Sequence, residues 1–261
     1  MKIALHGATG RMGRAIVGLA QAAGDVQIVG ASAAPGDPSQ GRDVGELAGA
    51  GTLGVAITAD VASSLLGAEA VIDFSVASAV KPLVALAVRN NVALVSGTTN
   101  VDESTLSAID RAASSIPVLW APNMSLGVQV LAELVEHAVR RLGPGFDVEI
   151  VEVHHRKKVD SPSGTAKRLA DAVRRVRPDV RELHGRDGDV GARTNREIAV
   201  LGVRGGDVVG DHTVFLLGSG ERLELVHRAS SRDLFAQGAL AAARFLVGKE
   251  PGRYTIADVL G

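Results

Sequence analysis

The residues of this sequence with the most evident capacity for chemistry lie together in the stretch 152–166, EVHHRKKVDSPSGTA. Two adjacent histidines, His154 and His155, are followed at once by an arginine and two lysines, the second of which is Lys158. Imidazoles change charge near neutral pH, and a lysine ammonium can donate a proton. The group therefore favours proton transfer involving a small, negatively charged molecule.

The elements on either side of this stretch would position those side chains. Residues 146–153 are rich in β-branched residues and predict a strand, and the apolar spacing from Ala166 onward predicts a helix. Ser163 is then a suitable N-cap, so Gly164 and Thr165 lie at a helix start, where N–H groups attract anions. Because successive strand residues point to opposite faces, the two histidines serve one site only if the strand ends or bends there.

Two other interpretations of the same stretch compete with this one. A charged loop is usually only a solvated loop, and Arg156, Lys157 and Lys158 taken alone favour that interpretation. A zinc site is a weaker alternative, and we expect no metal, since the chain has no cysteine and adjacent histidines lack the i, i+4 spacing of helical zinc ligands. The other histidines stand alone in the sequence, which favours structural roles for them: His6, His137, His184, His212 and His227.

A glycine-rich segment near the start of the chain indicates a nucleotide site. The segment 7–13, GATGRMG, follows a strand-like run over 2–6 and precedes a helix and a second strand over 26–31. In this context the glycines let the backbone approach a pyrophosphate, which binds at the helix N-terminus. The spacing is G-x-x-G-x-x-G rather than G-x-G-x-x-G, and any tight strand-to-helix turn could also use glycines.

Three further turns follow strand-like runs, at Asp73–Ser75, Gly97–Thr99 and Ala121–Met124. The repeated alternation of strands and helices in this part of the chain predicts a parallel, doubly wound sheet. The carboxyl ends of such strands share one edge, where ligands bind, so we expect the turns to form a common rim. A helix expected over 78–90 contains Pro82, which a helix tolerates in its first turn.

The pattern changes after a long helix that ends near residue 142. Three strand-like runs then follow one another, at 197–203, 212–217 and 222–229. Consecutive strands predict an antiparallel or mixed sheet, and hence a second domain of the α+β class. We therefore expect an α/β protein with a Rossmann-like, doubly wound parallel sheet over 1–124, completed by 235–261. The α+β domain would occupy 125–234.

Composition limits the classes of protein that fit. Hydrophobic residues make up 46% of the 261 residues and aromatic residues only 3%, so the core must be aliphatic, as in a buried parallel sheet. The net charge of −1 gives no bulk attraction to nucleic acid or membrane, and we expect neither as a partner. No run approaches the roughly 18 apolar residues of a membrane span. The absence of cysteine and of a signal-peptide pattern fits a cytoplasmic enzyme.

Taken together, these segments resemble the 4-hydroxy-tetrahydrodipicolinate reductase family, also called dihydrodipicolinate reductase, over essentially the whole chain. The stretch 152–166 is the most specific part of the match, and the turns at 7–13, 97–99 and 121–124 and the closing Asp258-Val-Leu260 agree with it. The resemblance implies an NAD(P)H-dependent reductase of the diaminopimelate route to lysine, which delivers hydride to a ring dicarboxylate with loss of water. It also implies a cytoplasmic homotetramer built through the sheet of the second domain.

The resemblance carries roles for individual residues. It implies that His154 is the general acid/base and Lys158 the proton donor. It implies that the carboxylates of the small dicarboxylate substrate bind His155, Lys158, Gly164 and Thr165. NADH or NADPH would contact the residues of three turns: Gly7, Ala8, Thr9, Gly10, Arg11, Met12, Gly97, Thr98, Thr99, Ala121, Pro122, Asn123 and Met124.

The chain departs from the family's pattern at the positions that determine the preference for NADH or NADPH. Family members often carry an acidic residue, sometimes followed by arginine, where this chain has Ala34 and Pro35, and some carry an arginine where it has Val76. A carboxylate there repels the 2′-phosphate of NADPH, and an arginine attracts it. Asp37 comes late, beyond Pro35 and Gly36, and the loop could bring either Asp37 or Arg42 to the strand end. We therefore expect poor discrimination, with kcat/KM values for NADH and NADPH within about tenfold.

Two other functions would use parts of the same sequence. A non-catalytic NAD(P)-sensing or scaffold protein would bind cofactor without turnover, but it need not keep a proton donor such as Lys158. An aspartate dehydrogenase or another amino-acid reductase on a similar fold would not need the stretch 152–166. Turnover of the ring dicarboxylate, with each cofactor titrated, separates the three functions.

Overall fold

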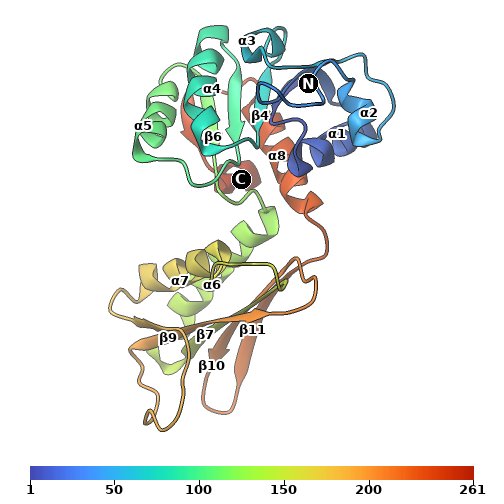
Figure 1. The fold of residues 1–261 in the computed structure, drawn as a ribbon. Helices are drawn as coiled ribbons and strands as arrows, with labels where there is room; N and C mark the ends of the chain where they lie inside the picture. Colours follow the sequence, from blue (N-terminus) through green and yellow to red (C-terminus); the bar gives the residue numbers. More distant parts are fainter. The chain divides into compact units, whose positions relative to one another are not determined.

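The computed structural model describes residues 1–261 and divides them into two compact units. Unit 1 consists of Met1–Ser125 and Asp233–Gly261, and unit 2 consists of Leu126–Arg232. In Figure 1 the last helices of the chain, coloured red, lie among the blue and green elements of unit 1. The C-terminal segment thus completes the first unit, and its short strand β12 (Gly252–Tyr254) pairs in parallel with β6 (Pro117–Trp120).

Unit 1 alternates strands with helices. The order of its strands in the sheet is β12-β6-β5-β4-β1-β2-β3, and every pairing is parallel. The order reverses between β1 and β4, as in a doubly wound sheet, so this part of the predicted fold is confirmed. The other elements of unit 1 are β1 (Lys2–His6), α1 (Arg11–Ala23), β2 (Gln27–Ser32), α2 (Val44–Ala48), β3 (Ile57–Thr58), α3 (Val61–Ser64), β4 (Ala70–Asp73), α4 (Ala77–Asn90), β5 (Ala93–Ser96), α5 (Glu103–Ala112), α8 (Asp233–Leu246) and α9 (Ile256–Leu260).

Helices cover both faces of this sheet. Helices α4 and α5 pack with apolar side chains of β1, β4, β5 and β6 on one face, while α1 and α8 lie together against the other. The central strands β4 and β5 are buried along their whole length, which explains why their sequences are apolar without alternation. The sheet therefore exposes only its edges, and polar groups concentrate where its strands end.

Helix α4 departs from the expected position of its proline. The helix begins at Ala77, so Pro82 lies in the second turn and not in the first. A proline inside a helix removes one N–H and costs about 3 kcal/mol. Buried Val80, Leu83 and Val84 lie on the same helix, and each such side chain contributes about 1.5–3 kcal/mol. Packing therefore outweighs the lost hydrogen bond, and the helix continues through the proline.

Unit 2 contains a five-stranded sheet of order β11-β10-β7-β9-β8. Strands β7, β9 and β8 are parallel to one another, whereas β10 runs antiparallel to both β7 and β11, so the predicted mixed sheet is confirmed. A tight hairpin at residues 218–220 joins β10 to β11. The elements of unit 2 are α6 (Leu126–Leu142), the 3₁₀ turn η1 (Gly143–Gly145), β7 (Asp147–His154), α7 (Gly164–Val176), β8 (Arg181–Leu183), β9 (Glu197–Arg204), β10 (Gly210–Leu217) and β11 (Arg222–Ala229).

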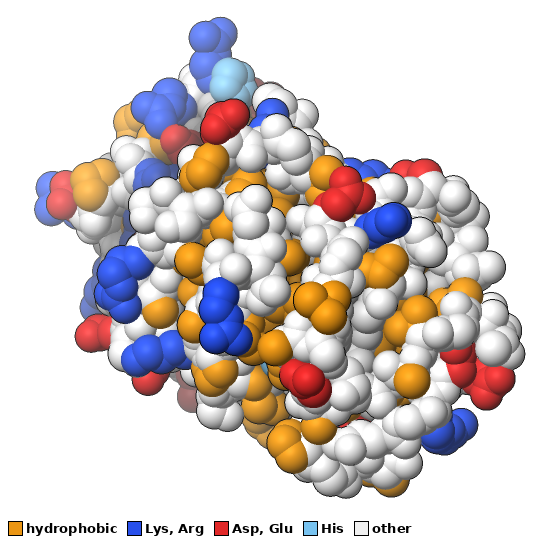
Figure 2. Space-filling model, turned by 90° about the horizontal axis from the view of Figure 1, so that it is seen from above, with side chains coloured by type: hydrophobic (Ala, Val, Ile, Leu, Met, Phe, Trp, Pro, Cys, Tyr) orange, Lys and Arg blue, Asp and Glu red, His pale blue; other side chains and the backbone are white.

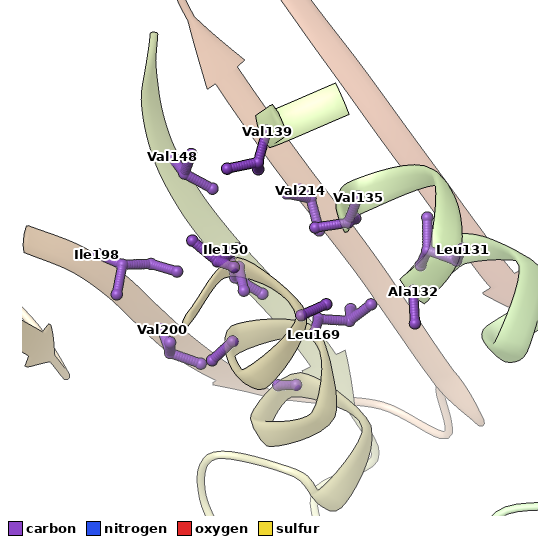
Figure 3. Packing of buried hydrophobic residues seen from close by; sticks show 14 of the residues in the cluster. Leu131, Ala132, Val135, Val139, Val148, Ile150, Leu169, Ile198, Val200 and Val214 are labelled. Atoms are coloured by element: carbon purple, nitrogen blue, oxygen red, sulfur yellow. The ribbon is translucent and has the colours of Figure 1, made fainter. Parts of the chain in front are cut away.

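Helices α6 and α7 pack on one face of this sheet (Figure 1). Figure 3 shows aliphatic side chains of both helices and of three strands pointing toward one another in this layer, including Val135, Leu169, Ile150, Val200 and Val214. Along β7 every second residue is buried, which is the pattern of a strand with one covered face. Neither helix covers the opposite face of the sheet.

Charged side chains are dispersed over the face of the molecule drawn in Figure 2. Single blue and red residues alternate there with apolar and neutral surface, in keeping with 28 basic and 29 acidic residues in the chain. None of the helices combines the length and the apolar character that crossing a membrane would need.

Candidate active site

Strand β7 ends at the first of the two adjacent histidines. Its alternation turns Glu152 and His154 toward the buried layer, while His155 lies beyond the strand end and its N–H donates to the carbonyl of Val208. The structural condition for both rings to act in one site, a strand that ends between them, is therefore met. Their surroundings differ: His154 contacts Glu152, and the Nε2 of His155 lies 3.4 Å from a guanidinium nitrogen of Arg232.

Glu152 binds most of the surrounding polar groups, although its side chain is completely buried. The His154 Nδ1 lies 2.6 Å from Oε2, and the two terminal nitrogens of Arg204 donate to the two carboxylate oxygens at 2.7 Å each. The backbone N–H of Ser163 also donates to Oε1, at 3.0 Å. One carboxylate thus joins β7, β9 and the start of α7.

The protonation states of this pair follow from their contacts. Burial by itself would raise the pKa of Glu152, but hydrogen bonds from Arg204, His154 and the Ser163 N–H outweigh it and lower the pKa below its usual value. Burial chiefly, aided by the charges of Lys158 and Arg204, also lowers the pKa of His154 against the opposing effect of Glu152. An ionised Glu152 therefore accepts a hydrogen bond from the Nδ1–H of a neutral His154, which leaves the lone pair on Nε2.

His212 of β10 adds a second buried imidazole to this group. Its ring meets that of His154 edge to face, with centroids 5.2 Å apart, and its Nε2 lies 3.0 Å from Ser163 Oγ. Burial, followed by the repulsion of His154, lowers the pKa of His212 to about 4, so this ring is neutral at pH 7. The sequence suggested a lone structural histidine here, but the pairing of β10 with β7 places it beside His154.

Helix α7 begins as predicted, with Ser163 as its N-cap. The Ser163 hydroxyl accepts from the backbone N–H of Ala166 at 3.1 Å, and Gly164 and Thr165 form the first turn, which holds no acidic residue. A helix start of this kind favours anions. Because Glu152 also binds Ser163, the anion-favouring turn and the imidazole of His154 are fixed to the same carboxylate.

The cations of the loop between β7 and α7 fall into two classes. Lys158 is held: its ammonium lies 2.8 and 3.0 Å from the two carboxylate oxygens of Asp160, and this contact lowers the pKa of Asp160. Arg204 also donates to the Asp160 carbonyl, at 2.7 Å. Arg156 and Lys157 are exposed, so the interpretation as a solvated basic loop applies to them but not to Lys158.

A second completely buried carboxylate, Asp73, lies at the end of β4 in unit 1. Its Oδ2 accepts from the hydroxyls of Ser96 and Thr98 at 2.7 and 2.8 Å, and its Oδ1 accepts from the N–H of Ser75 at 3.1 Å. The indole N–H of Trp120 donates to the carbonyl of Thr98 at 2.9 Å. Three of the predicted rim turns are therefore held together by one acid and its neighbours.

The glycine-rich turn packs against this rim. Gly7 has a positive φ of 79°, and its N–H and that of Ala8 both donate to the carbonyl of Ser32 at 3.0 Å. A Cβ at Gly7 would lie 2.5 Å from the carbonyl oxygen of Phe74, so no larger residue fits there. The turn thus brings its backbone against the strand ends, which is what a phosphate-binding turn requires.

A cavity of about 740 Å³ opens beside the turn. Gly7, Thr9 and Gly10 line it on one side, and the segment after β2, including Ala34 and Asp37, lines it on another. Its walls are mainly apolar with a few polar groups, and its size suits a small-molecule site. Predicted cofactor residues that do not line this cavity are Ala8, Arg11, Met12, Gly97, Thr98, Thr99, Ala121, Pro122, Asn123 and Met124. Of these, Ala8, Gly97, Thr98 and Met124 are buried: the side chains of Ala8 and Met124 belong to the core, and the Thr98 hydroxyl binds Asp73.

Comparison with known proteins identifies the family. Residues 1–124 match the N-terminal part of the dihydrodipicolinate reductase family, and residues 127–260 match its C-terminal part. The chain belongs to this family. It is 44% identical to the 4-hydroxy-tetrahydrodipicolinate reductase of Alkalilimnicola ehrlichii over 266 residues, which cover 100% of this chain and 98% of that protein. It is 47% identical to the enzyme of the same name from Anaeromyxobacter dehalogenans over 264 residues, which cover 100% and 97%.

A solved structure agrees with the fold. The dihydrodipicolinate reductase from Paenisporosarcina sp. TG-14, determined with dipicolinate bound, superposes with a TM-score of 0.80 and 21% identity, covering 99% of this chain and 98% of that one. These findings confirm the resemblance, the fold class and the reductase function expected from the sequence, and with them an oxidoreductase that uses a nicotinamide cofactor.

Sequence reasoning missed three residues of the polar group around His154. Glu152 had a usable signal, because it occupies an inward position of an alternating strand two residues before His154, where an apolar side chain is expected. Arg204 and His212 had none, since each lies on another strand and approaches Glu152 or His154 only through the pairing of the sheet.

Proposed function

We propose that unit 2 of this chain binds 4-hydroxy-tetrahydrodipicolinate and carries out its proton transfers, while unit 1 binds the nicotinamide cofactor. The observation that carries the proposal is the buried Glu152 carboxylate, which fixes the imidazole of His154 and the start of α7 together. A bound nicotinamide cofactor supplies the hydride. The proton that the reaction consumes must come from the chain or from water.

Loss of water and reduction require a base and an acid. The departing hydroxyl needs a proton, a neighbouring C–H must give one up, and a further proton accompanies the hydride. In our proposal the neutral His154, with its lone pair on Nε2, accepts a proton, and the positive charge that results is stabilised by Glu152. The ammonium of Lys158, which Asp160 holds in place, donates a proton to the departing hydroxyl, and the protonated His154 returns its proton to the ring when the hydride arrives. These are the roles that general acid–base catalysis asks of an imidazole and an ammonium.

The substrate's two carboxylates need cationic or N–H donors. We propose that Lys158 and His155 bind them together with the first turn of α7, at Gly164 and Thr165. Arg232 lies beside His155 and adds a positive charge to that ring's surroundings. The bound dipicolinate of the Paenisporosarcina structure, which is itself a ring dicarboxylate, supports this class of ligand.

The glycine-rich turn fits a nicotinamide dinucleotide. Gly7 admits no Cβ because the backbone of Phe74 lies so close, and the adjoining cavity is large enough for part of a dinucleotide. We propose that Gly7, Thr9 and Gly10 contact it directly, with Arg11 and Met12 at the helix start. The turns at 97–99 and 121–124 would lie along the rest of the cofactor.

The deciding experiment is a reductase assay with freshly prepared condensation product of the preceding synthase reaction, which follows the loss of reduced-nicotinamide absorbance. We expect turnover with at least one reduced cofactor and formation of tetrahydrodipicolinate. Binding of NADH or NADPH without any turnover would contradict the proposal, because it is what a cofactor-sensing protein would show.

We also propose a cytoplasmic homotetramer that forms through the uncovered face of the unit 2 sheet. The register of the strands places Val151, Val153, Val203, Thr213 and Val226 on that face, and Val203 and Val226 are 48% and 43% exposed. Such an apolar sheet face is typical of an interface. Light scattering should give the mass of four chains, and charged substitutions at Val203 and Val226 should reduce it.

A further inference from the structure

The segment after β2 reverses direction within four residues. The N–H of Asp37 donates to the carbonyl of Ala34 at 3.1 Å, and Gly36 has a φ of 81°. Proline at the second position and a positive φ at the third define a type II turn. The Pro35-Gly36 pair therefore sends the chain back toward the sheet, instead of carrying Asp37 away from the strand end.

The reversal places the carboxylate of Asp37 on the glycine-rich turn. Its Oδ2 accepts from the Thr9 hydroxyl at 2.8 Å, and its Oδ1 accepts from the N–H of Ser39 at 2.8 Å. The second contact is the local Asx type of hydrogen bond, which fixes the side chain relative to its own loop. Both oxygens are thus held, one by the turn and one by the loop.

Asp37 has acceptor capacity beyond these contacts. A carboxylate has about four lone-pair positions, and the contacts with the Thr9 hydroxyl and with the N–H and side chain of Ser39 occupy at most three of them. The same side chain lines the 740 Å³ cavity together with Ala33 and Ala34, at the end of the second strand. The hydrogen bonds from Ser39 and Thr9 also lower its pKa, so the group is negative at neutral pH. A fixed negative charge therefore lies where dinucleotide sites of this fold read the ribose.

We infer that Asp37 takes the place of the missing strand-end carboxylate, binds the adenosine ribose hydroxyls, and makes the chain select NADH over NADPH. The inference rests on the proposed cofactor site in unit 1. It revises the expectation of equal use of the two cofactors, which assumed that no carboxylate reaches the strand end. An unphosphorylated ribose would donate to Asp37, whereas a 2′-phosphate would meet a like charge.

One nearby cation could act in the opposite sense. The Nε of Arg14 donates to the carbonyl of Thr9 at 3.0 Å, and its charge contributes to the lowered pKa of Asp37. If Arg14 instead governed recognition, it would attract the 2′-phosphate and favour NADPH. The Arg14 guanidinium is already bound to the Thr9 carbonyl and attracted to Asp37, so its charge is directed at the chain and not at a cofactor. Asp37 is therefore favoured as the residue that decides between NADH and NADPH.

The test is direct titration of the full chain with NADH and with NADPH, followed by cofactor fluorescence or calorimetry without substrate. A hydrogen bond to a charged group, together with repulsion of the phosphate, should make Kd for NADH at least about tenfold lower than Kd for NADPH. Asp37→Asn keeps the shape and the Ser39 contact but removes the charge, so it should bring the two Kd values within about threefold. Asp25→Asn removes an exposed carboxylate of unit 1 that pairs with Arg244, and it should leave the ratio unchanged.

Three results would overturn the inference: equal affinities in the wild type, an unchanged ratio in Asp37→Asn, or an NADPH preference that Arg14→Gln abolishes. Because the titration needs no substrate, it separates this inference from the reductase function. Turnover with an NADPH preference would contradict only the role of Asp37. Selective NADH binding without turnover would contradict only the proposed reductase reaction.

Discussion

Each unit of the molecule contains one completely buried carboxylate at the end of a strand, and the two are neutralised in different ways. Glu152 at the end of β7 has an arginine and a histidine as partners. Asp73 at the end of β4 has only hydroxyl and backbone donors, from Ser96, Thr98 and Ser75. Both carboxylates have the hydrogen bonds that burial demands, but only Glu152 is hydrogen-bonded to a side chain that can exchange a proton near neutral pH.

This difference distinguishes a site built for proton transfer, around Glu152, from a site that only positions turns, around Asp73. Cations near Glu152 keep its carboxylate ionised, and that charge fixes the tautomer of His154 and stabilises its protonated form. Neutral donors around Asp73 offer no proton at neutral pH but fix the mutual positions of the turns that follow β4 and β5. A reactive site thus uses charge-assisted contacts, and a site that only has to hold a shape uses neutral ones.

The largest effect should follow from removing the proton donor of the charged site. Lys158→Ala should lower kcat/KM by about 10²–10⁴-fold, the usual contribution of general acid catalysis. Cofactor affinity should not change, because the glycine-rich turn belongs to the other unit. Steady-state kinetics and a cofactor titration measure the two quantities, and Lys157→Ala, which removes an exposed neighbour, is the control. Activity within a few-fold of wild type would remove Lys158 from the mechanism.

Neutralising each buried carboxylate in turn tests the energetic difference between the two sites. Glu152→Gln removes the buried charge that the partly exposed Arg204 and the His154 imidazole bind, and breaking a pair of this kind costs up to about 3–5 kcal/mol. Asp73→Asn keeps one acceptor oxygen, and the hydroxyls of Ser96 and Thr98 can rotate to meet the new amide, so about 1–2 kcal/mol should be lost. Urea unfolding of both variants gives the two values. Equal losses would mean that the two sites do not differ in the way described.

The two adjacent histidines sharpen the comparison within unit 2. His154→Gln removes the imidazole that Glu152 holds and should mainly lower kcat, by about 10²-fold or more. His155→Gln removes a proposed carboxylate contact and should mainly raise KM, by about tenfold. The two variants should therefore affect different kinetic constants, kcat for His154→Gln and KM for His155→Gln. The opposite pattern in steady-state kinetics would exchange the roles of the two residues.

The sequence predicted the local structure at the proposed sites better than it predicted which side chains hold those sites together. Local signals were enough for the N-cap at Ser163, the strand end at His154 and the turn at Gly7, because each depends on a few neighbouring residues. Arg204 and His212 could not be found in this way. They approach His154 and Glu152 through strand pairings with partners about 50 residues away, and no local pattern encodes that register.

Asp37 illustrates a different limit. The segment 34–37 contains a proline and a glycine, which from the sequence mean only that the chain turns. Whether the turn carries the carboxylate toward the strand end or away from it depends on the sign of φ at Gly36 and on the hydroxyl of Thr9, a partner 28 residues earlier in the chain. The same composition could have left the cofactor site without any charge.

The most specific effect concerns the neutral imidazole of His212. Its pKa is about 4 in the folded chain, against about 6.5 when unfolded, chiefly because the ring is buried and because its protonated form would be repelled by a protonated His154. A histidine whose pKa is lowered by folding stabilises the fold above the unfolded pKa, and this stability is lost as the pH falls from about 6.5 toward 4. At pH 5 the loss amounts to about 2 kcal/mol.

His6 of unit 1 is the matched comparison for this prediction. Burial lowers its pKa too, but the nearby charge of Asp73 opposes that shift. Urea unfolding at pH 7 and pH 5 should therefore show that His212→Asn, which keeps a polar partner for Ser163, removes more of the acid destabilisation than His6→Asn does. The remaining dependence in His212→Asn comes from other histidines with lowered pKa values, His154 and His227 among them. If His6→Asn instead removed as much of the acid destabilisation, the charge of Asp73 would not offset burial at His6. The electrostatic surroundings of the two buried carboxylates would then be equivalent.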